Sequence, residues 1–503
     1  MKKFTSAIYI AVLLLFQAGF FCQADVSIRE IETKVVRVFA TKKANYYHKP
    51  WKTPNFASVR GSGFFFKDEQ AFPGEKGLIL TNAHVVSMAQ SLWVSNGREK
   101  RRYRVKPIGT CNMADFAVVQ MEAREFGAYE ERNGEVVPLE LGDSDKVRMG
   151  DKVQGWGYPL GGERISKSEE GEISRIEVNR YAYSRELWLM VQASLQQNRG
   201  NSGGPVLKEG KVVGIAFQGI RSGDRLNYFI PINLVRGLLP LLQKQEVIPR
   251  WRLIVQPLFA RLRDYYGLKS EDGGVLVDYV IPDGGPHKFG LRAKDILIEI
   301  DGHRIDNFGD IFFEPLRQKI YFREILNRKM VGDPLTVKVI RDQESLEIKG
   351  EVTPSLPVLV PKVFTPANYF IFGGLGFVEL TYNCLQTLGK SGVSLKEKYW
   401  GEYPAKPNQK IVIISEVFPE YGLVKTSPYL RRVKKINGEQ VLNLEHLYKQ
   451  IHALKEASKK RALLELSRKL MLPLDITGAE ALEQDIQQKY GILYMRTPGG
   501  FHY

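Results

Sequence analysis

The sequence has little cysteine and histidine and a single long apolar run. Three cysteines and seven histidines occur in 503 residues. Cys22 lies in the N-terminal apolar run, and Cys111 and Cys384 are far apart, so we expect two separate buried thiols rather than a disulfide framework. No HExxH or CxxC motif occurs, and we expect no metal site and no cofactor. After the N-terminal run, no stretch reaches the roughly 18–20 apolar residues of a membrane-spanning helix.

The N-terminal run has the three-part layout of a secretory signal. A basic start and an apolar segment are followed by small side chains at Cys22 and Ala24. Residues 1–24 are therefore interpreted as a signal peptide, and cleavage near Ala24 would give an exported protein, periplasmic or secreted. An uncleaved membrane anchor is the alternative. A lipoprotein signal is disfavoured, because the bulky Phe20 and Phe21 precede the cysteine.

The chain is basic, with a formal net charge of +16. Such a balance is compatible with binding to nucleic acid or to an anionic membrane. However, the lysines and arginines are interspersed with acids, and the densest basic run, at 98–106, leads directly into apolar sequence. We therefore interpret the charge as a solvated basic surface and expect no nucleic-acid partner.

The pattern of apolar residues, glycines and prolines changes twice along the chain. Up to about residue 235, short runs rich in β-branched and aromatic residues alternate with glycine-rich turns, which favours an all-β barrel or sandwich. The strands are expected at 34–40, 61–66, 77–86, 114–121, 151–159, 187–194 and 210–217, with a closing helix at 231–245. The later parts are expected to be two related α+β modules at 250–353 and 367–503, joined by a proline-rich linker at 354–366.

Three residues in the β-rich part suggest nucleophilic catalysis. His84 follows an apolar strand in LTNAHVV, Asp115 stands at the lip of another in ADFAVV, and Ser202 is set among glycines in NRGNSGGP. Each residue alone is commonly structural: a histidine at a strand end, an acid capping a strand, a serine in a tight turn. Together, the order His–Asp–Ser suits a double β-barrel serine protease.

These motifs resemble those of the HtrA (DegP-like) branch of trypsin-fold serine proteases. LTNAHVV, ADFAVV, LGDSDKVRMGDKVQGWGYPLGG, NRGNSGGPVLKEGKVVGIAF and NYFIPINLV occur in order over most of 33–235. The later modules resemble PDZ domains through GLRAKDILIEIDGHRI and, more weakly, VKKINGEQVLNLEHL. The FGGLGFVEL segment makes the chain most similar to the plant-organelle Deg proteases, while the signal argues for a bacterial relative of them. The resemblance implies a mainly β fold: a trypsin-like double β-barrel protease domain at 25–245 followed by two α+β PDZ-like domains, the second degenerate.

The resemblance also implies roles for individual residues. His84 would be the base for Ser202, and Asp115 would orient the imidazole. The oxyanion hole would be formed by backbone N–H groups of Gly200 and Ser202, with Asn201 between them.

Substrate-binding residues are expected at four further positions. Gln196 would lie at the base of the specificity pocket, and Phe217, Gln218 and Gly219 would pair with the substrate backbone. Because Gln196 is not acidic, cleavage after Lys or Arg is not expected. The resemblance implies a preference for a small or medium apolar residue. The alternative is that Gln196 only packs within its loop.

The partners expected from this resemblance are polypeptides. PDZ-like modules bind extended peptides or C-termini at a sheet edge, and FGGLGF could capture the carboxylate, although a degenerate module could equally serve assembly. The aromatic tract 46–56 suggests a homo-oligomer, a trimer or a multiple of trimers, or else a loop packed on its own barrel. The function expected is ATP-independent endoproteolysis of misfolded or damaged exported proteins. The alternative is a chaperone or peptide-binding scaffold with weak or switched-off proteolysis.

Overall fold

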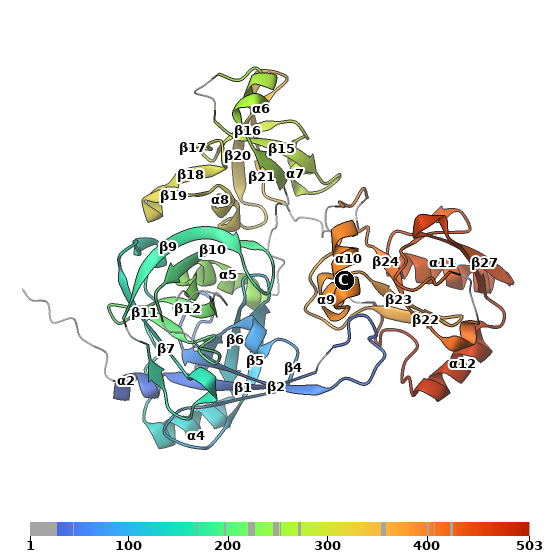
Figure 1. Ribbon diagram of the computed structural model, residues 1–503. Helices are drawn as coiled ribbons and strands as arrows, with labels where there is room; N and C mark the ends of the chain where they lie inside the picture. Colours follow the sequence, from blue (N-terminus) through green and yellow to red (C-terminus); the bar gives the residue numbers. More distant parts are fainter. Residues whose placement is uncertain are drawn as a thin grey trace, which may run out of the picture.

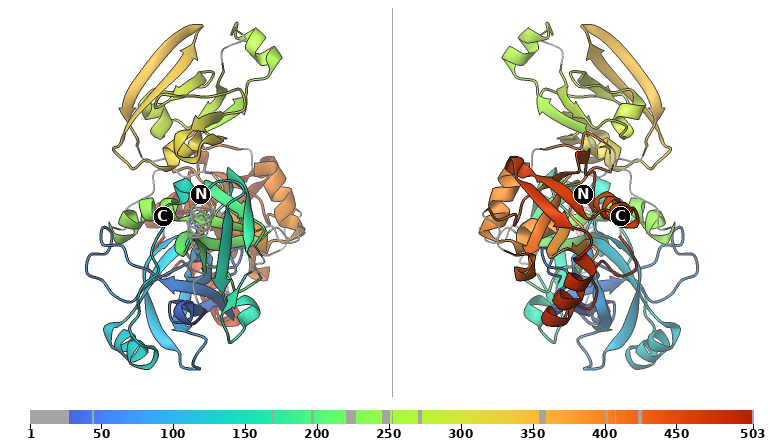
Figure 2. Two further views of the ribbon diagram at one scale, coloured as in Figure 1. Left: turned by 90° about the vertical axis from the view of Figure 1, so that its left-hand side faces the viewer. Right: turned by 90° about the vertical axis from the view of Figure 1, so that its right-hand side faces the viewer.

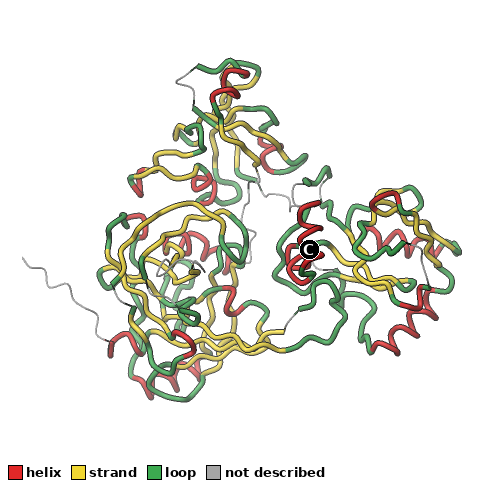
Figure 3. Tube along the Cα trace, viewed as in Figure 1, coloured by secondary structure: helices red, strands yellow, loops and turns green. Residues whose placement is uncertain are grey.

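The computed structural model describes residues 28–501 apart from short internal gaps. The residues outside the description are 1–27, 44, 169, 196–197, 220–226, 245–250, 252, 270–272, 354–358, 400–401, 407, 423–425 and 502–503. The predicted signal peptide with Ala24, and Gln196, therefore lie outside the described residues. No helix in the described ranges is both long and apolar enough to span a bilayer. The described chain forms two β-barrels and two smaller α+β units (Figures 1 and 3).

The first barrel is closed and has the strand order β1-β2-β3-β6-β5-β4. Its core strands are continuous apolar runs, as in FAVVQM, where five of the six residues are buried. Its strands are β1 (Val35–Lys43), β2 (Phe56–Phe65), β3 (Leu78–Thr81), β4 (Ala89–Ser95), β5 (Tyr103–Cys111) and β6 (Phe116–Met121), and its helices α2 (Ile28–Glu32), α3 (Ala83–Val86) and α4 (Ala123–Asn133).

One predicted strand of this barrel is shorter than expected. The strand predicted over 77–86 ends at Thr81, and His84 instead lies on the single helical turn α3. The chain leaves the sheet at Asn82, whose side-chain Nδ2 donates to the backbone oxygen of Asp115 (2.9 Å). This buried hydrogen bond holds the ends of β3 and β6 together, and the turn it stabilises carries His84.

The second barrel follows a short 3₁₀ turn, η1 (Ser144–Lys146). Its strand order is β11-β12-β13-β10-β9-β7-β8, and an additional pairing of β11 with β7 closes it. The helix predicted over 231–245 is α5, which packs against the strands of both barrels and ends the protease-like part. The elements are β7 (Lys152–Gly157), β8 (Ser166–Lys167), β9 (Gly171–Arg180), β10 (Leu187–Ala193), β11 (Pro205–Lys208), β12 (Lys211–Gly219), β13 (Asn227–Pro231), η2 (Pro159–Gly161) and α5 (Ile232–Lys244).

The first PDZ-like unit is built on one antiparallel sheet with the order β14-β15-β16-β20-β21. β14 is therefore an edge strand. The hairpin β18–β19 and helix α8 extend from this sheet toward the second barrel (Figure 1). The elements are β14 (Leu253–Pro257), β15 (Val275–Val280), β16 (Ile296–Ile300), β17 (His303–Arg304), β18 (Asp310–Phe313), β19 (Gln318–Tyr321), β20 (Pro334–Arg341), β21 (Glu344–Glu351), α6 (Ala260–Tyr265), α7 (Gly285–Phe289), α8 (Arg323–Asn327) and η3 (Glu314–Leu316).

The first PDZ-like unit shares a buried core with the second barrel. One continuous cluster of buried apolar side chains includes Ile176 and Leu189 from the barrel and Phe313 and Leu316 from the unit. The Asn327 side chain donates to the backbone oxygen of Leu187 across the same junction (3.1 Å). Views from two sides show the unit resting on one end of the barrels (Figure 2). The two parts are thus packed together rather than linked by a loop alone.

The second PDZ-like unit contains a three-stranded and a four-stranded sheet, with the orders β22-β23-β24 and β26-β25-β27-β28. Leu359 and Val360, in the segment predicted to be a linker, belong to its buried core. Cys111 in β5 and Cys384 in α9 are both buried and free, as expected. The elements are β22 (Tyr369–Phe372), β23 (Leu375–Glu379), β24 (Val412–Val417), β25 (Val433–Ile436), β26 (Glu439–Gln440), β27 (Arg461–Leu466), β28 (Met471–Asp475), α9 (Tyr382–Thr387), α10 (Lys390–Tyr399), α11 (Leu444–Glu456), α12 (Ala479–Tyr490), η4 (Pro419–Tyr421) and η5 (Ser467–Lys469).

The aromatic tract 46–56 packs against the second PDZ-like unit. It forms most of the loop between β1 and β2, which extends from the first barrel toward that unit (Figure 1). Tyr47 is buried in the core cluster of the unit, and the Trp51 ring lies 5.6 Å from that of Tyr369 and 6.1 Å from that of Phe418. Within the chain, the tract therefore joins the first barrel to the last unit.

Candidate active site

The structure brings His84 and Asp115 together through two hydrogen bonds. The backbone N–H of His84 donates to Asp115 Oδ1 (2.7 Å), and His84 Nδ1 lies 2.7 Å from Asp115 Oδ2. Because a carboxylate only accepts, the proton of the neutral imidazole resides on Nδ1. Nε2 is left as the acceptor. The pair therefore has the tautomer that a general base requires.

Local backbone geometry sets the position of Asp115. The residue sits at the start of β6 with φ 54°, and its side chain is 1% exposed. Asp is one of the few residues that adopt this left-handed conformation readily. Its carboxylate thereby points toward His84 in α3. His84 is also held by Lys42, whose Nζ donates to the His84 backbone oxygen (2.6 Å).

The loop that carries Ser202 requires glycine at two positions. Gly200 has φ 106°, and a Cβ there would stand 2.3 Å from the backbone oxygen of Tyr158. Gly203 has φ 91°, and its Cβ would stand 2.2 Å from the backbone oxygen of Ser62. The loop is also tied to β2, because Ser62 Oγ donates to Gly200 O (2.7 Å) and Ser62 N to Ser202 O (2.8 Å). Ser202 is thus presented by a tightly packed turn at the junction of the two barrels.

Two backbone N–H groups in this loop have no acceptor among the described residues. Those of Asn201, Gly203 and Gly204 donate to Asn198 O, Ala216 O and Asn201 O, whereas those of Gly200 and Ser202 donate to none. Two free N–H groups flanking one residue form the kind of donor pair that stabilises an oxyanion. These are the two donors that the sequence analysis predicts.

The Ser202 hydroxyl is directed toward β12. Its Oγ donates to the backbone oxygen of Phe217 (3.3 Å), and within the described residues it makes no hydrogen bond to His84. The imidazole of His84 is stacked on Tyr183, with ring centroids 4.0 Å apart and an angle of 7° between the planes. A hydrogen bond from Ser202 Oγ to His84 Nε2 therefore requires the hydroxyl to leave Phe217 O, and in proteases without substrate such bonds are often long or poorly aligned.

Two half-buried lysines flank Asp115. Burial lowers the pKa of Lys42 to about 8, and the negative charge of Asp115 opposes this effect. Burial likewise lowers the pKa of Lys362 to about 8, with Asp115 raising it and Arg185 lowering it further. Lys42 comes from β1 and Lys362 from the segment between the PDZ-like units. Both place positive charge near the Asp115 carboxylate.

The remaining predicted substrate-binding residues lie on β12 where they are described. Phe217 has a buried side chain, and Gln218 and Gly219 pair with β13. On its other edge β12 pairs with β11 only as far as Ile215. Beyond that point the edge has no strand partner in the described ranges, which leaves room for an added strand. The pocket role of Gln196 remains a prediction.

Sequence reasoning missed Tyr183, Lys42 and Lys362. Tyr183 lies in the turn between β9 and β10, and Lys362 is more than 150 residues after Ser202 in sequence. Neither belongs to a motif, so only the folded chain brings them to the site. Lys42 lies near the polar end of β1, between the exposed Thr41 and Lys43, so no sequence pattern marks it either.

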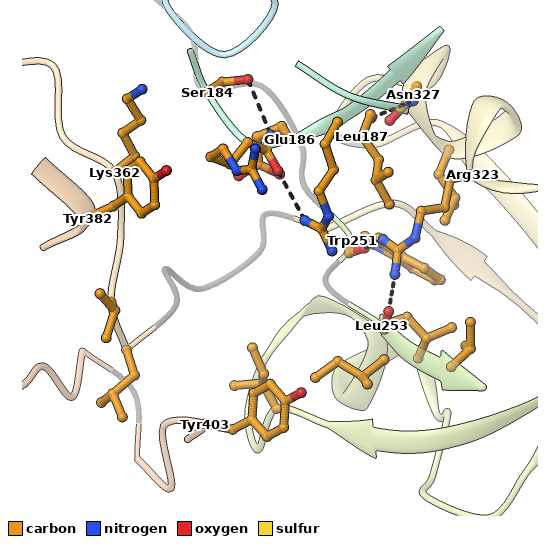
Figure 4. A pocket seen from close by; sticks show the side chains of 18 of the residues that line it. Ser184, Glu186, Leu187, Trp251, Leu253, Arg323, Asn327, Lys362, Tyr382 and Tyr403 are labelled. Carbon is orange, nitrogen blue, oxygen red and sulfur yellow. Dashed lines mark hydrogen bonds between the residues drawn. The ribbon is translucent and has the colours of Figure 1, made fainter. Parts of the chain in front are cut away.

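A cavity of about 370 Å³ lies beside the site, where three parts of the chain meet. Figure 4 shows Lys362 and Tyr382 on one side and Arg323 and Leu253 on the other. Arg323 donates to the backbone oxygens of Trp251 (3.1 Å) and Leu253, at the start of the edge strand β14. The β9–β10 hairpin that carries Tyr183 also borders this cavity.

Comparison with known proteins agrees with this architecture. The model of the trypsin-like peptidase domain matches residues 61–215, and that of the PDZ domain matches 360–499. Putative protease Do-like 3, mitochondrial, of Arabidopsis thaliana is 31% identical over 463 residues, which cover 90% of this chain and 77% of that protein. The chain belongs to the Deg (HtrA) family of serine endopeptidases. The resemblance and the mainly β fold class inferred from the sequence are confirmed.

Other Deg proteins show the same relationship. Protease Do-like 2, chloroplastic, of Arabidopsis thaliana is 28% identical, covering 91% of this chain and 74% of that protein. Probable periplasmic serine endoprotease DegP-like of Halomonas elongata is 30% identical over 56% of this chain and 54% of that protein. A variant of the HtrA-type protease AlgW with a decapeptide has a TM-score of 0.50 and 21% identity, covering 65% of this chain and 97% of that one. This last likeness concerns the fold.

Proposed function

We propose that this Deg protease hydrolyses peptide bonds through His84, Asp115 and Ser202. The observation that carries the proposal is the doubly hydrogen-bonded His84–Asp115 pair beside a serine whose loop holds two free N–H groups. A serine hydroxyl is a weak nucleophile at neutral pH and needs an adjacent base. In this proposal His84 is that base, and Asp115 is the group that orients it.

The proton path follows from the tautomer. After Ser202 Oγ rotates toward His84, Nε2 takes its proton as Oγ attacks the substrate carbonyl carbon, and returns it to the leaving amine. Asp115 Oδ2 holds the Nδ1–H and stabilises the imidazolium while it exists. Water then attacks the acyl-enzyme with the same base, which releases the acid product and restores Ser202.

The oxyanion is stabilised by the N–H groups of Gly200 and Ser202, on either side of Asn201. Neither group has an acceptor among the described residues, so no hydrogen bond between described residues must break when the oxyanion forms. Removing one such donor typically raises the barrier by about 2.7–4 kcal/mol. The substrate strand adds to β12 at Phe217, Gln218 and Gly219, where the edge has no partner in the described ranges.

Cleavage follows small or medium apolar residues rather than Lys or Arg. This part of the proposal rests on Gln196, a neutral residue at the position expected to form the pocket base. Peptide libraries varied at the cleaved residue measure it directly. A preference for Lys or Arg contradicts it.

Peptide recognition is assigned to the first PDZ-like unit. Its β14 is an edge strand bordering the cavity of about 370 Å³, so an extended peptide or C-terminus can add to it. In the second unit, β23 is paired with β22 on one side and with β24 on the other. An added strand there would have to displace one of them, so we assign the second unit to packing and assembly.

The biological role proposed is ATP-independent degradation of misfolded or damaged exported polypeptides. The signal layout of residues 1–24 and the absence of a phosphate-binding motif from the sequence support it. N-terminal sequencing of the purified protein tests cleavage near Ala24, and light scattering tests the proposed homo-oligomer, a trimer or a multiple of trimers.

Casein turnover without ATP tests the proteolytic function. The wild type is expected to degrade unfolded casein and to be labelled by a fluorophosphonate probe, and Ser202→Ala to do neither. If the two proteins are equally inert while both suppress aggregation of an unfolded client, the chaperone or scaffold function replaces the proposal. Labelling that survives Ser202→Ala contradicts the assignment of the nucleophile.

A further inference from the structure

The stacking of Tyr183 on His84 closes one face of the catalytic imidazole. The ring centroids are 4.0 Å apart and the planes differ by 7°. This distance is the ordinary contact separation between carbon atoms, so nothing fits between the rings. The Tyr183 ring also lies 6.3 Å from the ring of Phe217, on the strand to which the substrate would add. Tyr183 thus lies between His84 and β12, next to the place where the substrate strand would add.

An extended substrate directs one particular side chain to this place. Successive side chains of a strand point to opposite sides. The residue whose carbonyl meets Ser202 sends its side chain toward the pocket formed by the preceding loop. The residue before it, called here the penultimate residue, therefore points the other way, toward His84 and Tyr183. The space beside the imidazole is the subsite of the penultimate residue.

Lys362 braces Tyr183 from the side of the second PDZ-like unit. Its Nζ lies 5.9 Å from the centre of the Tyr183 ring, 5.8 Å from that of Phe364 and 5.5 Å from that of Tyr382 in α9. An ammonium group within about 6 Å of aromatic faces is attracted to each of them. The side chain of Lys362 is anchored on the second unit, beside Tyr382 (Figure 4). Lys362 thereby connects the second PDZ-like unit to the Tyr183 ring that is stacked on His84.

We propose that Tyr183 determines specificity at the penultimate residue, because its ring fills the subsite beside His84, and that Lys362 holds the ring there. Substrates with glycine or alanine at the penultimate position fit without displacing Tyr183. Larger side chains must push the ring off the imidazole against the contacts with Phe217 and Lys362. This inference rests on the proposed function, since it concerns the substrate of the same site.

Two fluorogenic peptides that differ only in glycine or leucine at the penultimate position test the proposal on the full chain. Tyr183→Ala is expected to raise the leucine-to-glycine ratio of kcat/KM by about tenfold, the range in which a pocket discriminates one small apolar group. Tyr183→Phe keeps the stacked ring and should keep the wild-type ratio. Tyr265→Ala removes an 80%-exposed tyrosine elsewhere and serves as the matched control. Lys362→Met keeps the aliphatic stem without the charge and should raise the ratio by about threefold.

The outcomes separate this inference from the proposed function. Fluorophosphonate labelling of Ser202 shows that each variant retains a reactive nucleophile. If Tyr183→Ala is labelled normally but its ratio equals that of the wild type, or both peptides slow equally, Tyr183 does not fill the subsite and the inference is wrong. If Tyr183→Ala fails to fold, Lys362→Met decides, and an unchanged ratio overturns the inference. If no protein is labelled at Ser202, the proposed function itself is wrong.

Discussion

The indole of Trp51 lies directly against the backbone of Gly376, although the two residues are 325 positions apart in the sequence. A Cβ built on Gly376 would stand 2.6 Å from Cη2 of Trp51. Trp51 comes from the loop between two strands of the first barrel, and Gly376 from β23 of the second PDZ-like unit. Lys49, in the same loop, forms an ion pair with Glu416, the residue opposite Gly376 in the strand ladder. The first barrel therefore packs closely against the second PDZ-like unit at Gly376, where only a glycine leaves room for the Trp51 ring.

Gly376→Ala should destabilise the protein because the added methyl overlaps Trp51. Overpacking of this kind costs about 1–3 kcal/mol in the free energy of unfolding. In a Trp51→Ala background the same substitution should cost little, since the overlapping atoms are gone. Chemical denaturation of the four proteins in this double-mutant cycle measures the coupling. Equal costs in the two backgrounds would contradict the contact.

Asp115→Asn should lower kcat by about 10⁴-fold with little change in folding, the effect expected for a Ser–His–Asp enzyme. The carboxylate accepts two N–H groups from His84, and an amide has only one oxygen with which to do so. The imidazole then loses its Nδ1–H tautomer and cannot act as the base. Steady-state kinetics measure the loss, and Asp278→Asn, at an exposed position on β15, is the control. Comparable turnover by the two variants contradicts the assignment.

Gly200→Ala should abolish most activity by moving the loop. The new Cβ would meet Tyr158 O at 2.3 Å, and φ 106° is unfavourable for alanine. Displacing one oxyanion donor lowers kcat by about 10²–10³-fold. Fluorophosphonate labelling and kcat report the loss. Gly127→Ala, in helix α4 with nothing within 4 Å of the new Cβ, should leave activity unchanged.

Arg328→Met should destabilise the docked first PDZ-like unit by about 3–5 kcal/mol near neutral pH. Arg328 makes a two-point contact with Asp145 of η1 (2.7 and 2.8 Å) and donates to the buried Glu324 (2.8 Å). Without Arg328, Glu324 is a buried carboxylate with no cation beside it. Denaturant unfolding measures the loss. The double variant Glu324→Gln/Arg328→Met should recover most of the stability, and failure to recover contradicts the explanation.

The loss caused by Arg328→Met should also depend on pH. Burial raises the pKa of Glu324 above its ordinary value, and removal of Arg328 raises it further. Between the two pKa values the folded state binds more protons than the unfolded state, so stability falls as pH rises through this window. The variant should therefore lose less stability at about pH 5 than at about pH 7.5, where the unfolded carboxylate is ionised. An effect independent of pH would contradict the role of Glu324.

The residues proposed as catalytic could be named from the sequence because the chemistry expected of them leaves local patterns there. Ser202 is surrounded by the glycines that its turn requires. His84 follows an apolar strand, and Asp115 precedes one. The exact backbone around His84 could not be predicted in the same way. The apolar residues of LTNAHVV suit a buried strand, and the break at Asn82 depends on a hydrogen bond to Asp115 O, 33 residues away.

Contacts between the folded units leave no comparable local pattern in the sequence. Tyr183 reaches His84 from a hairpin turn, and Lys362 reaches Tyr183 from a proline-rich segment that reads as a linker. Trp51 belongs to an aromatic tract that was expected to join protomers or to cover its own barrel, and it contacts the second PDZ-like unit. The partner of an exposed aromatic loop depends on how the folded units are arranged, which no periodicity encodes.

The apolar cluster shared by the second barrel and the first PDZ-like unit changes what a minimal enzyme must contain. A fragment ending at residue 245 would keep every proposed catalytic residue, yet it would lose the side chains that the first PDZ-like unit contributes to this cluster, Phe313 and Leu316 among them. The apolar side chains of the barrel that pack against that unit would then be exposed, and exposed apolar patches promote aggregation. The smallest stable protease fragment of this chain should therefore end near residue 353. The protease domain and the first PDZ-like unit should unfold together, as one cooperative unit.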